Sequence, residues 1–210
     1  KSEPNLIASL LVKNNINALT IDLRNYGQST IVSHYENLGL TEYLDVLGAF
    51  DFLQTRGFKK HQIGLLGISL GASTVIFAAS YEPAIQAIWS ESSLAKFDMI
   101  LTDEIHRYGF PDFFGPAVSI SGKFLTGIDP TDLNPVYVLN NLQNYFFTHG
   151  EKDQRIYARH FNFIKSYATA NSINAEYWLA HDAGHVDLML MHPEEYGSRM
   201  KIFFEKYLRN

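Results

Sequence analysis

Cysteine is missing from this sequence of 210 residues, and its absence excludes several kinds of chemistry. Without thiols the chain forms no disulfide, holds no thiolate zinc site and carries no cysteine nucleophile. The absence does not fix the compartment. Whether the protein is cytoplasmic, membrane-anchored or exported therefore stays open at this stage.

An excess of basic residues is also missing, as is any long apolar run. The 17 Lys and Arg are outnumbered by 22 Asp and Glu, which gives a net charge of −5, and the basic residues form no cluster. We therefore expect no nucleic-acid partner. No apolar stretch approaches twenty residues, so we expect no membrane segment in this chain. With 46% hydrophobic residues, its length suits one globular domain.

The segment Gly67-Ile68-Ser69-Leu70-Gly71 lies between an apolar run and a stretch of small residues. The run 63–66 is typical of a short buried strand, and residues 72–80 are typical of a helix. A strand, a sharp turn and a helix are the context of a nucleophile elbow, whose strained turn lifts the serine hydroxyl clear of the sheet. We expect a side chain at either glycine to collide with the neighbouring strand or helix. A phosphate loop is excluded, because no Lys-Ser/Thr follows the second glycine.

Strand and helix patterns alternate along most of the chain. We expect further strands at 17–23, 85–89, 145–148 and 175–179, and helices at 3–14, 41–56, 155–171 and 193–208. This alternation predicts an α/β fold, a three-layer sandwich with a mostly parallel sheet covered by helices on both faces. Residues 95–140 break the pattern with many aromatic side chains. They are interpreted either as a cap insertion over the active site or as a pair of packing helices with surface aromatics.

Three residues suited to acyl transfer are expected beyond the carboxyl ends of these strands. A serine hydroxyl needs a base to take its proton, and a base histidine needs a carboxylate to fix its tautomer. Asp153 follows the strand 145–148, and His185 follows the strand 175–179. Together with Ser69 they occur in the chain order serine, acid, histidine that is expected for a fold with a nucleophile elbow.

Other residues compete for these roles. Glu91 is the alternative carboxylate, because it ends the strand after the elbow helix. His181 is expected to pack or cap near the end of its strand, and His149 is expected to be structural. His181 and His185 are four residues apart, but the glycine between them denies them a shared helical face, so we expect no metal. Acyl transfer by a serine, a histidine and a carboxylate also needs no organic cofactor, and we expect none.

Four motifs in this order resemble those of the α/β-hydrolase superfamily, in its serine-aminopeptidase-like branch. They are Asp22-Leu23-Arg24-Asn25-Tyr26-Gly27-Gln28-Ser29, the elbow, the acid loop 149–153 and the histidine loop 183–187 with 192–196. The first motif departs from the family by having Asn25 where glycine is usual. The resemblance implies that Ser69 is the nucleophile, His185 the general acid–base and Asp153 its orienting carboxylate. It also implies that the backbone N–H of Leu70 is one oxyanion donor.

The second oxyanion donor of the family comes from a loop ahead of its first helix. Because the helix 3–14 opens this sequence, we expect the chain to be the greater part of an N-terminally incomplete single domain spanning 1–210. The resemblance implies a serine hydrolase that cleaves carboxylic esters of small or medium acyl groups. The alternatives are an aminopeptidase-like enzyme, for which Asp103 and Glu104 are weak candidates to bind a free amino terminus, and a silent fold used for binding. We expect a small-molecule acyl substrate and a monomer or homodimer.

Overall fold

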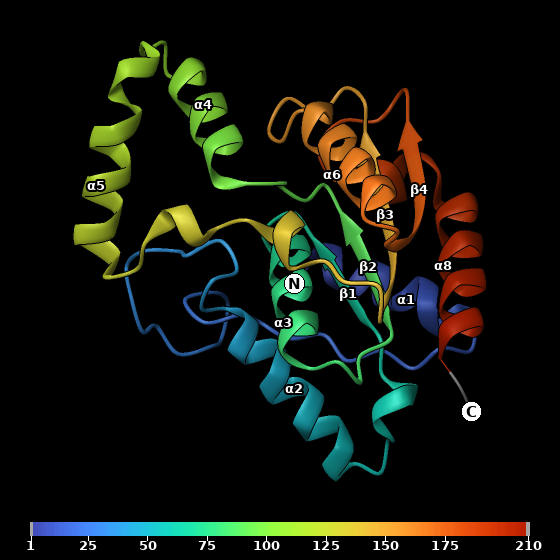
Figure 1. Ribbon diagram of the computed structural model, residues 1–210. Helices are drawn as coiled ribbons and strands as arrows, with labels where there is room; N and C mark the ends of the chain where they lie inside the picture. Colours follow the sequence, from blue (N-terminus) through green and yellow to red (C-terminus); the bar gives the residue numbers. More distant parts are fainter. Residues whose placement is uncertain (1, 209–210) are drawn as a thin grey trace.

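The computed structural model of this protein describes residues 2–208, and within them four parallel strands form one sheet in the order β1-β2-β3-β4 (Figure 1). The strands are β1 (Leu65–Ile68), β2 (Ala87–Glu91), β3 (Asn144–Gly150) and β4 (Asn174–Ala180). The helices are α1 (Ser2–Lys13), α2 (Tyr43–Thr55), α3 (Leu70–Tyr81), α4 (Phe97–Arg107), α5 (Gly115–Thr126), α6 (Ala158–Ala170), α7 (Leu188–Met191) and α8 (Pro193–Tyr207). Short 3-10 turns are η1 (Lys60–Gln62), η2 (Asp112–Phe114), η3 (Pro130–Asp132) and η4 (Pro135–Val138).

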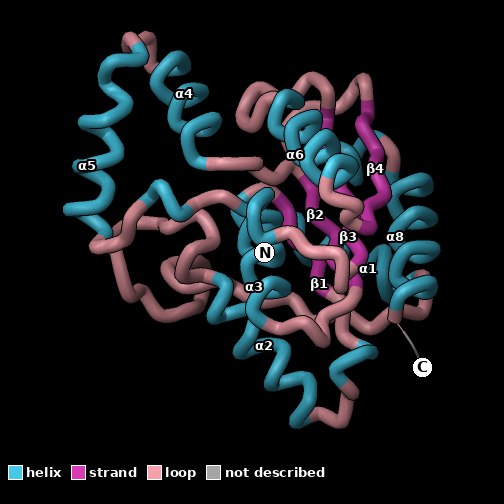
Figure 2. Tube along the Cα trace, viewed as in Figure 1, coloured by secondary structure: helices cyan, strands magenta, loops and turns pink. Residues whose placement is uncertain are grey.

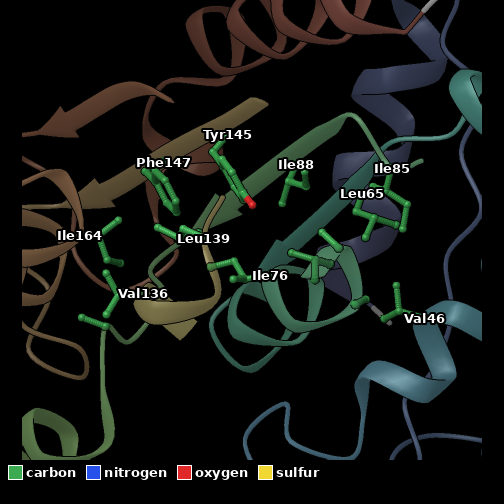
Figure 3. Packing of buried hydrophobic residues seen from close by; sticks show 14 of the residues in the cluster. Val46, Leu65, Ile76, Ile85, Ile88, Val136, Leu139, Tyr145, Phe147 and Ile164 are labelled. Carbon is green, nitrogen blue, oxygen red and sulfur yellow. The ribbon is translucent and has the colours of Figure 1, made fainter. Parts of the chain in front are cut away.

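Helices cover both faces of the sheet, as the α/β pattern predicts. On one face α3 and α6 pack against the strands, and α2 packs against α3 in the larger apolar cluster (Figure 3). On the other face α1 and α8 pack over Trp89 and Phe146, whose rings stack with centroids 4.0 Å apart. The three-layer arrangement leaves the carboxyl ends of the parallel strands together at one edge.

The helix after the elbow is buried on every side. Eight consecutive residues, 72–79, are buried in α3. A helix of this kind belongs in the interior, and its small side chains allow it to lie close to β1 and β2. The burial fixes the position of its N-terminus directly behind Ser69.

The segment 17–23 was predicted to be a strand, and this prediction is wrong. Within residues 2–208, no strand pairs with the segment 17–23. Of the described strands, β1 pairs only with β2. Its apolar residues Ile21 and Leu23 instead pack partly buried against the larger cluster. An apolar pattern reports burial, whereas a strand also requires a hydrogen-bonding neighbour at about 4.8 Å.

Asn25 accommodates the backbone conformation expected of the glycine that it replaces. Its φ is 67°, in the left-handed region that asparagine tolerates better than most residues. Its side-chain Oδ1 accepts hydrogen bonds from the N–H groups of Val32 at 2.8 Å and Ser33 at 3.0 Å. The substitution therefore keeps the loop closed.

The interruption at 95–140 forms a pair of helices, α4 and α5, that stand beside the sandwich and are joined to it by loops (Figures 1 and 2). Their aromatic side chains are largely exposed, as the second of the two interpretations expected: Tyr108 by 72%, Phe113 by 73% and Phe124 by 86%. We call α4 and α5 the cap helices. Across residues 2–208, no helix is long and apolar enough to cross a membrane.

Candidate active site

Ser69 lies on a strained turn between β1 and α3. Its φ of 51° and ψ of −116° are costly for a residue with a side chain. A Cβ atom added at Gly67 would lie 2.1 Å from the carbonyl oxygen of Gly71, so the turn closes only with glycine at position 67. The same expectation for Gly71 is wrong, because a Cβ added there has no atom of a neighbouring strand or helix within 4 Å. The close approach is therefore made by one glycine of the motif.

His185 connects Ser69 to Asp153 by two hydrogen bonds. Its Nε2 lies 2.9 Å from Oγ of Ser69, and its Nδ1 lies 2.7 Å from Oδ2 of Asp153. The serine follows β1, the aspartate follows β3 and the histidine follows β4, so parallel strands deliver all three to one edge. The hydroxyl can donate to Nε2 while Nδ1 donates to the carboxylate, which is the tautomer that a general base requires.

Asp153 is 2% exposed, and its carboxylate is held by the chain that follows it. Oδ1 accepts hydrogen bonds from the N–H groups of Arg155 at 2.8 Å and Ile156 at 2.9 Å. Burial alone would raise its pKa. The hydrogen bonds from His185 and from these N–H groups outweigh the burial and hold the pKa of Asp153 below its usual value. The carboxylate is therefore ionised and oriented before any substrate arrives.

His149 is buried below the acid loop. Its Nε2 donates to the carbonyl of Ile156 at 2.7 Å and lies 3.4 Å from Oδ2 of Asp153. Burial lowers the pKa of His149 and so keeps the ring neutral. The Nε2–H group then stays hydrogen-bonded to the carbonyl oxygen of Ile156. By contrast, the expectation that His181 packs or caps is wrong. Its side chain is exposed, and its Nδ1 lies 2.6 Å from Oε2 of Glu151.

Glu91, the alternative carboxylate, faces a different partner. Its Oε2 accepts the hydroxyl of Tyr196 at 2.6 Å, and no hydrogen bond within residues 2–208 joins it to His185. The Glu91 side chain is fully buried, and this burial raises its pKa to about 7. The partnership with Tyr196 was not foreseen in the sequence, where the tyrosine appeared only as part of the histidine loop.

Leu70 begins α3, so its N–H has no acceptor within the helix. The positive end of the α3 dipole lies at the same place. Beside His185 a cavity of about 180 Å³ opens between α1, the strand ends and the histidine loop. Its lining is mostly apolar and consists of Leu6, Ile7, Ile68, Val186, Met189 and Leu190, together with Glu91, His185 and Asp187.

Neither a protein-family model nor a curated protein sequence matches this chain. Several solved structures are similar to it. An esterase from Pyrococcus furiosus superposes with a TM-score of 0.74 at 22% identity, over 98% of this chain and 75% of that one. A sugar hydrolase from Lactococcus lactis gives a TM-score of 0.75 at 11% identity, over 98% of this chain and 82% of the other. The acylaminoacyl peptidase of Pyrococcus horikoshii gives 0.63 at 18% identity, over 82% of this chain and 28% of that chain.

These likenesses, together with the parallel sheet and its helical layers, show that the chain has the α/β-hydrolase fold. The identities are too low to carry more than the fold. What the chain does has to be argued from its own residues.

Proposed function

We propose that this chain is a serine hydrolase that cleaves carboxylic esters of small or medium acyl groups through an acyl-enzyme intermediate. The observation that carries the proposal is the continuous hydrogen-bonded chain from Ser69 through His185 to Asp153. A protein that only binds ligands has no physical need for a strained serine, a base at 2.9 Å and a buried, ionised carboxylate behind it.

In this proposal His185 moves the proton. Its Nε2 takes the hydroxyl proton of Ser69 as Oγ attacks the ester carbonyl, and Asp153 stabilises the imidazolium that forms. The N–H of Leu70 donates to the oxyanion of the tetrahedral intermediate. His185 then gives its proton to the leaving alcohol, and a water molecule repeats the sequence to release the acid and restore Ser69.

The volume beside His185 supports the proposed substrate size. A cavity of about 180 Å³ with mostly apolar walls is large enough for a short alkyl group. Six of the nine lining residues are apolar, which suits an uncharged acyl group.

The aminopeptidase alternative depended on acidic side chains free to bind an amino terminus. Both candidates already pair with cations of this chain. Asp103 forms an ion pair with Arg159 and accepts a hydrogen bond from Nε2 of His160, and Glu104 lies 3.2 Å from Nη1 of Arg107. The ester is therefore the better-supported substrate.

A fluorophosphonate probe followed by peptide mapping tests the proposal, because the probe reacts with activated serines and not with ordinary ones. We expect one adduct, on Ser69, which is lost in Ser69→Ala. Ser92 provides a matched control. It also has a positive φ, of 53°, at the end of β2, but its hydroxyl has no hydrogen-bond partner among the described residues. Labelling that persists in Ser69→Ala, or that disappears in Ser92→Ala alone, would contradict the assignment.

A further inference from the structure

Arg107, in the last turn of cap helix α4, is hydrogen-bonded to the loop that carries Asp153. The guanidinium Nη2 of Arg107 donates to the carbonyl oxygens of Gln154 at 2.9 Å and Arg155 at 2.7 Å. These are the two residues that follow Asp153 in the chain. A side chain from the cap therefore holds the backbone beside the acid of the proposed triad.

The same two peptide units hold the Asp153 carboxylate at their other ends. The carbonyl of Gln154 shares a peptide unit with the N–H of Arg155, and the carbonyl of Arg155 shares one with the N–H of Ile156. Both N–H groups donate to Oδ1 of Asp153, at 2.8 and 2.9 Å. A trans peptide is planar, and its C=O and N–H groups point in opposite directions. A hydrogen bond from Arg107 to the C=O group therefore fixes the direction in which the N–H group of the same peptide points.

The charge of Arg107 adds to this geometric effect. A guanidinium on a carbonyl oxygen polarises the peptide unit and strengthens the hydrogen bond that its N–H donates. The stronger donation keeps the negative charge of Asp153 in place and turns Oδ2 toward His185, 2.7 Å away. Arg107 itself lies far enough along α4 to have no contact with Ser69 or His185 among the described hydrogen bonds and ion pairs.

Further contacts fix α4 against α6, so that Arg107 is held in position. Glu104 Oε1 lies 3.2 Å from Nη1 of Arg107. One helical turn before Arg107, the buried Asp103 accepts a hydrogen bond from Nε2 of His160 at 2.9 Å and forms an ion pair with Arg159, both on α6. The Nδ1 of His160 accepts the N–H of Ala95 at 2.9 Å, at the start of the cap segment. The base of α4 is therefore held by two sets of polar contacts, one to α6 and one to the acid loop.

We propose that Arg107 is a positioning residue, which orients the carboxylate of Asp153 through the peptide units on either side of Arg155 and so couples the cap to the triad. The inference rests on the proposed function. A displacement of α4 is then transmitted to the acid, although no residue of α4 or α5 lines the cavity beside His185.

A double-mutant cycle tests the coupling. Arg107→Met keeps an unbranched apolar stem and removes the guanidinium with its hydrogen bonds. We expect a loss of roughly tenfold in kcat for p-nitrophenyl butyrate with KM within about twofold, since the altered interaction lies behind the triad and not in the binding pocket. In the Asp153→Asn background the same substitution should cost less than twofold, because the carboxylate through which it acts is gone. Arg107→Lys should recover part of the loss.

Lys123→Met is the matched control, because it removes an exposed cap ion pair, with Asp129 at 2.6 Å, that is remote from the acid loop. We expect it to leave kcat unchanged. An equal loss in both backgrounds, or in Lys123→Met, would overturn the proposal, as would an unchanged kcat in Arg107→Met.

The low-field proton NMR signal of His185 Nδ1–H gives a readout that needs no turnover. It should shift in Arg107→Met and stay in place in Lys123→Met, and an unmoved signal in Arg107→Met would overturn the inference. If the unmodified chain hydrolyses no ester, the proposed function fails, whereas the NMR comparison still decides the role of Arg107.

Discussion

The Nδ1 atom of His185 lies 2.7 Å from Oδ2 of Asp153, and this pairing selects one of the two buried carboxylates at the edge of the sheet. Glu91, the other, is held by the hydroxyl of Tyr196 at 2.6 Å. The two acids are comparably buried, so partner geometry and not accessibility distinguishes them.

A pair of isosteric substitutions tests this selection. Asp153→Asn should lower kcat for an activated ester by about 10⁴-fold, since an amide cannot hold the required tautomer or stabilise the imidazolium. Glu91→Gln should cost less than about tenfold, because Glu91 is not hydrogen-bonded to the histidine. Steady-state kinetics on both variants decides the question, and a greater loss in Glu91→Gln would move the carboxylate role to Glu91.

The raised pKa of Glu91 predicts that stability depends on pH. Folding raises this pKa from 4.5 to about 7, so between these values the folded chain keeps a proton that the unfolded chain has released. The favourable contribution of the protonated acid is therefore present below pH 4.5 and is lost as the pH rises to about 7. A shift of this size corresponds to roughly 3 kcal/mol.

Glu91→Gln removes the titration and provides the reference. Urea unfolding of both proteins from pH 4.5 to 8 should show the variant gaining free energy of unfolding relative to the unmodified chain up to about pH 7. The difference should be constant above that pH. Parallel curves would mean that Glu91 titrates normally in the folded state.

The sequence could predict that Ser69, Asp153 and His185 lie together, because the relevant rule is topological. Parallel strands deliver their carboxyl ends to one edge, so the strand patterns alone bring Ser69, Asp153 and His185 together. The elbow could be predicted for a local reason, since a strand, a glycine and a helix constrain one another over a few residues.

The sequence could not predict features that depend on distant partners. Residues 17–23 have the apolar pattern of a strand, but a strand also needs a neighbour, which no local pattern specifies. The contact of Arg107 with Gln154 and Arg155 joins positions almost fifty residues apart. Nothing in the local sequence distinguishes this arginine from one on a solvated helix face. The prediction that a side chain at Gly71 would collide with its surroundings was wrong for a similar reason, because the space around a Cβ atom depends on the final packing.

The two elbow glycines should respond differently to alanine. Gly67→Ala places a methyl group 2.1 Å from the Gly71 carbonyl, and the backbone must move to relieve this overlap. We expect a loss of about 3 kcal/mol in the free energy of unfolding, at the upper end for overpacking, and a large loss of activity. Gly71→Ala meets no atom of a neighbouring strand or helix and lies within α3, where alanine is the better helix former.

Urea unfolding at pH 7 measures both variants. Gly71→Ala should be neutral or more stable by up to about 1 kcal/mol. If Gly71→Ala destabilised the protein as much as Gly67→Ala, the steric account of the elbow would be wrong.

The strain at Ser69 predicts that the proposed nucleophile lowers the stability of the fold. With φ at 51° and ψ at −116°, a residue with a Cβ is disfavoured there, whereas glycine is not. Ser69→Ala and Ser69→Gly both remove the hydroxyl, and both should lose esterase activity by about 10⁶-fold. They differ in the Cβ, so Ser69→Gly should unfold with a free energy about 1 kcal/mol higher than Ser69→Ala.

Ser80 provides the control of opposite sign, because it lies in regular α3 backbone. There the glycine variant should be less stable than the alanine variant by up to about 1 kcal/mol, since glycine is a poor helix former. Urea unfolding of the four variants measures both differences. If glycine were the less stable residue at both positions, the backbone at Ser69 would not be strained, and the turn would be an ordinary helix start instead of an elbow built at the expense of stability.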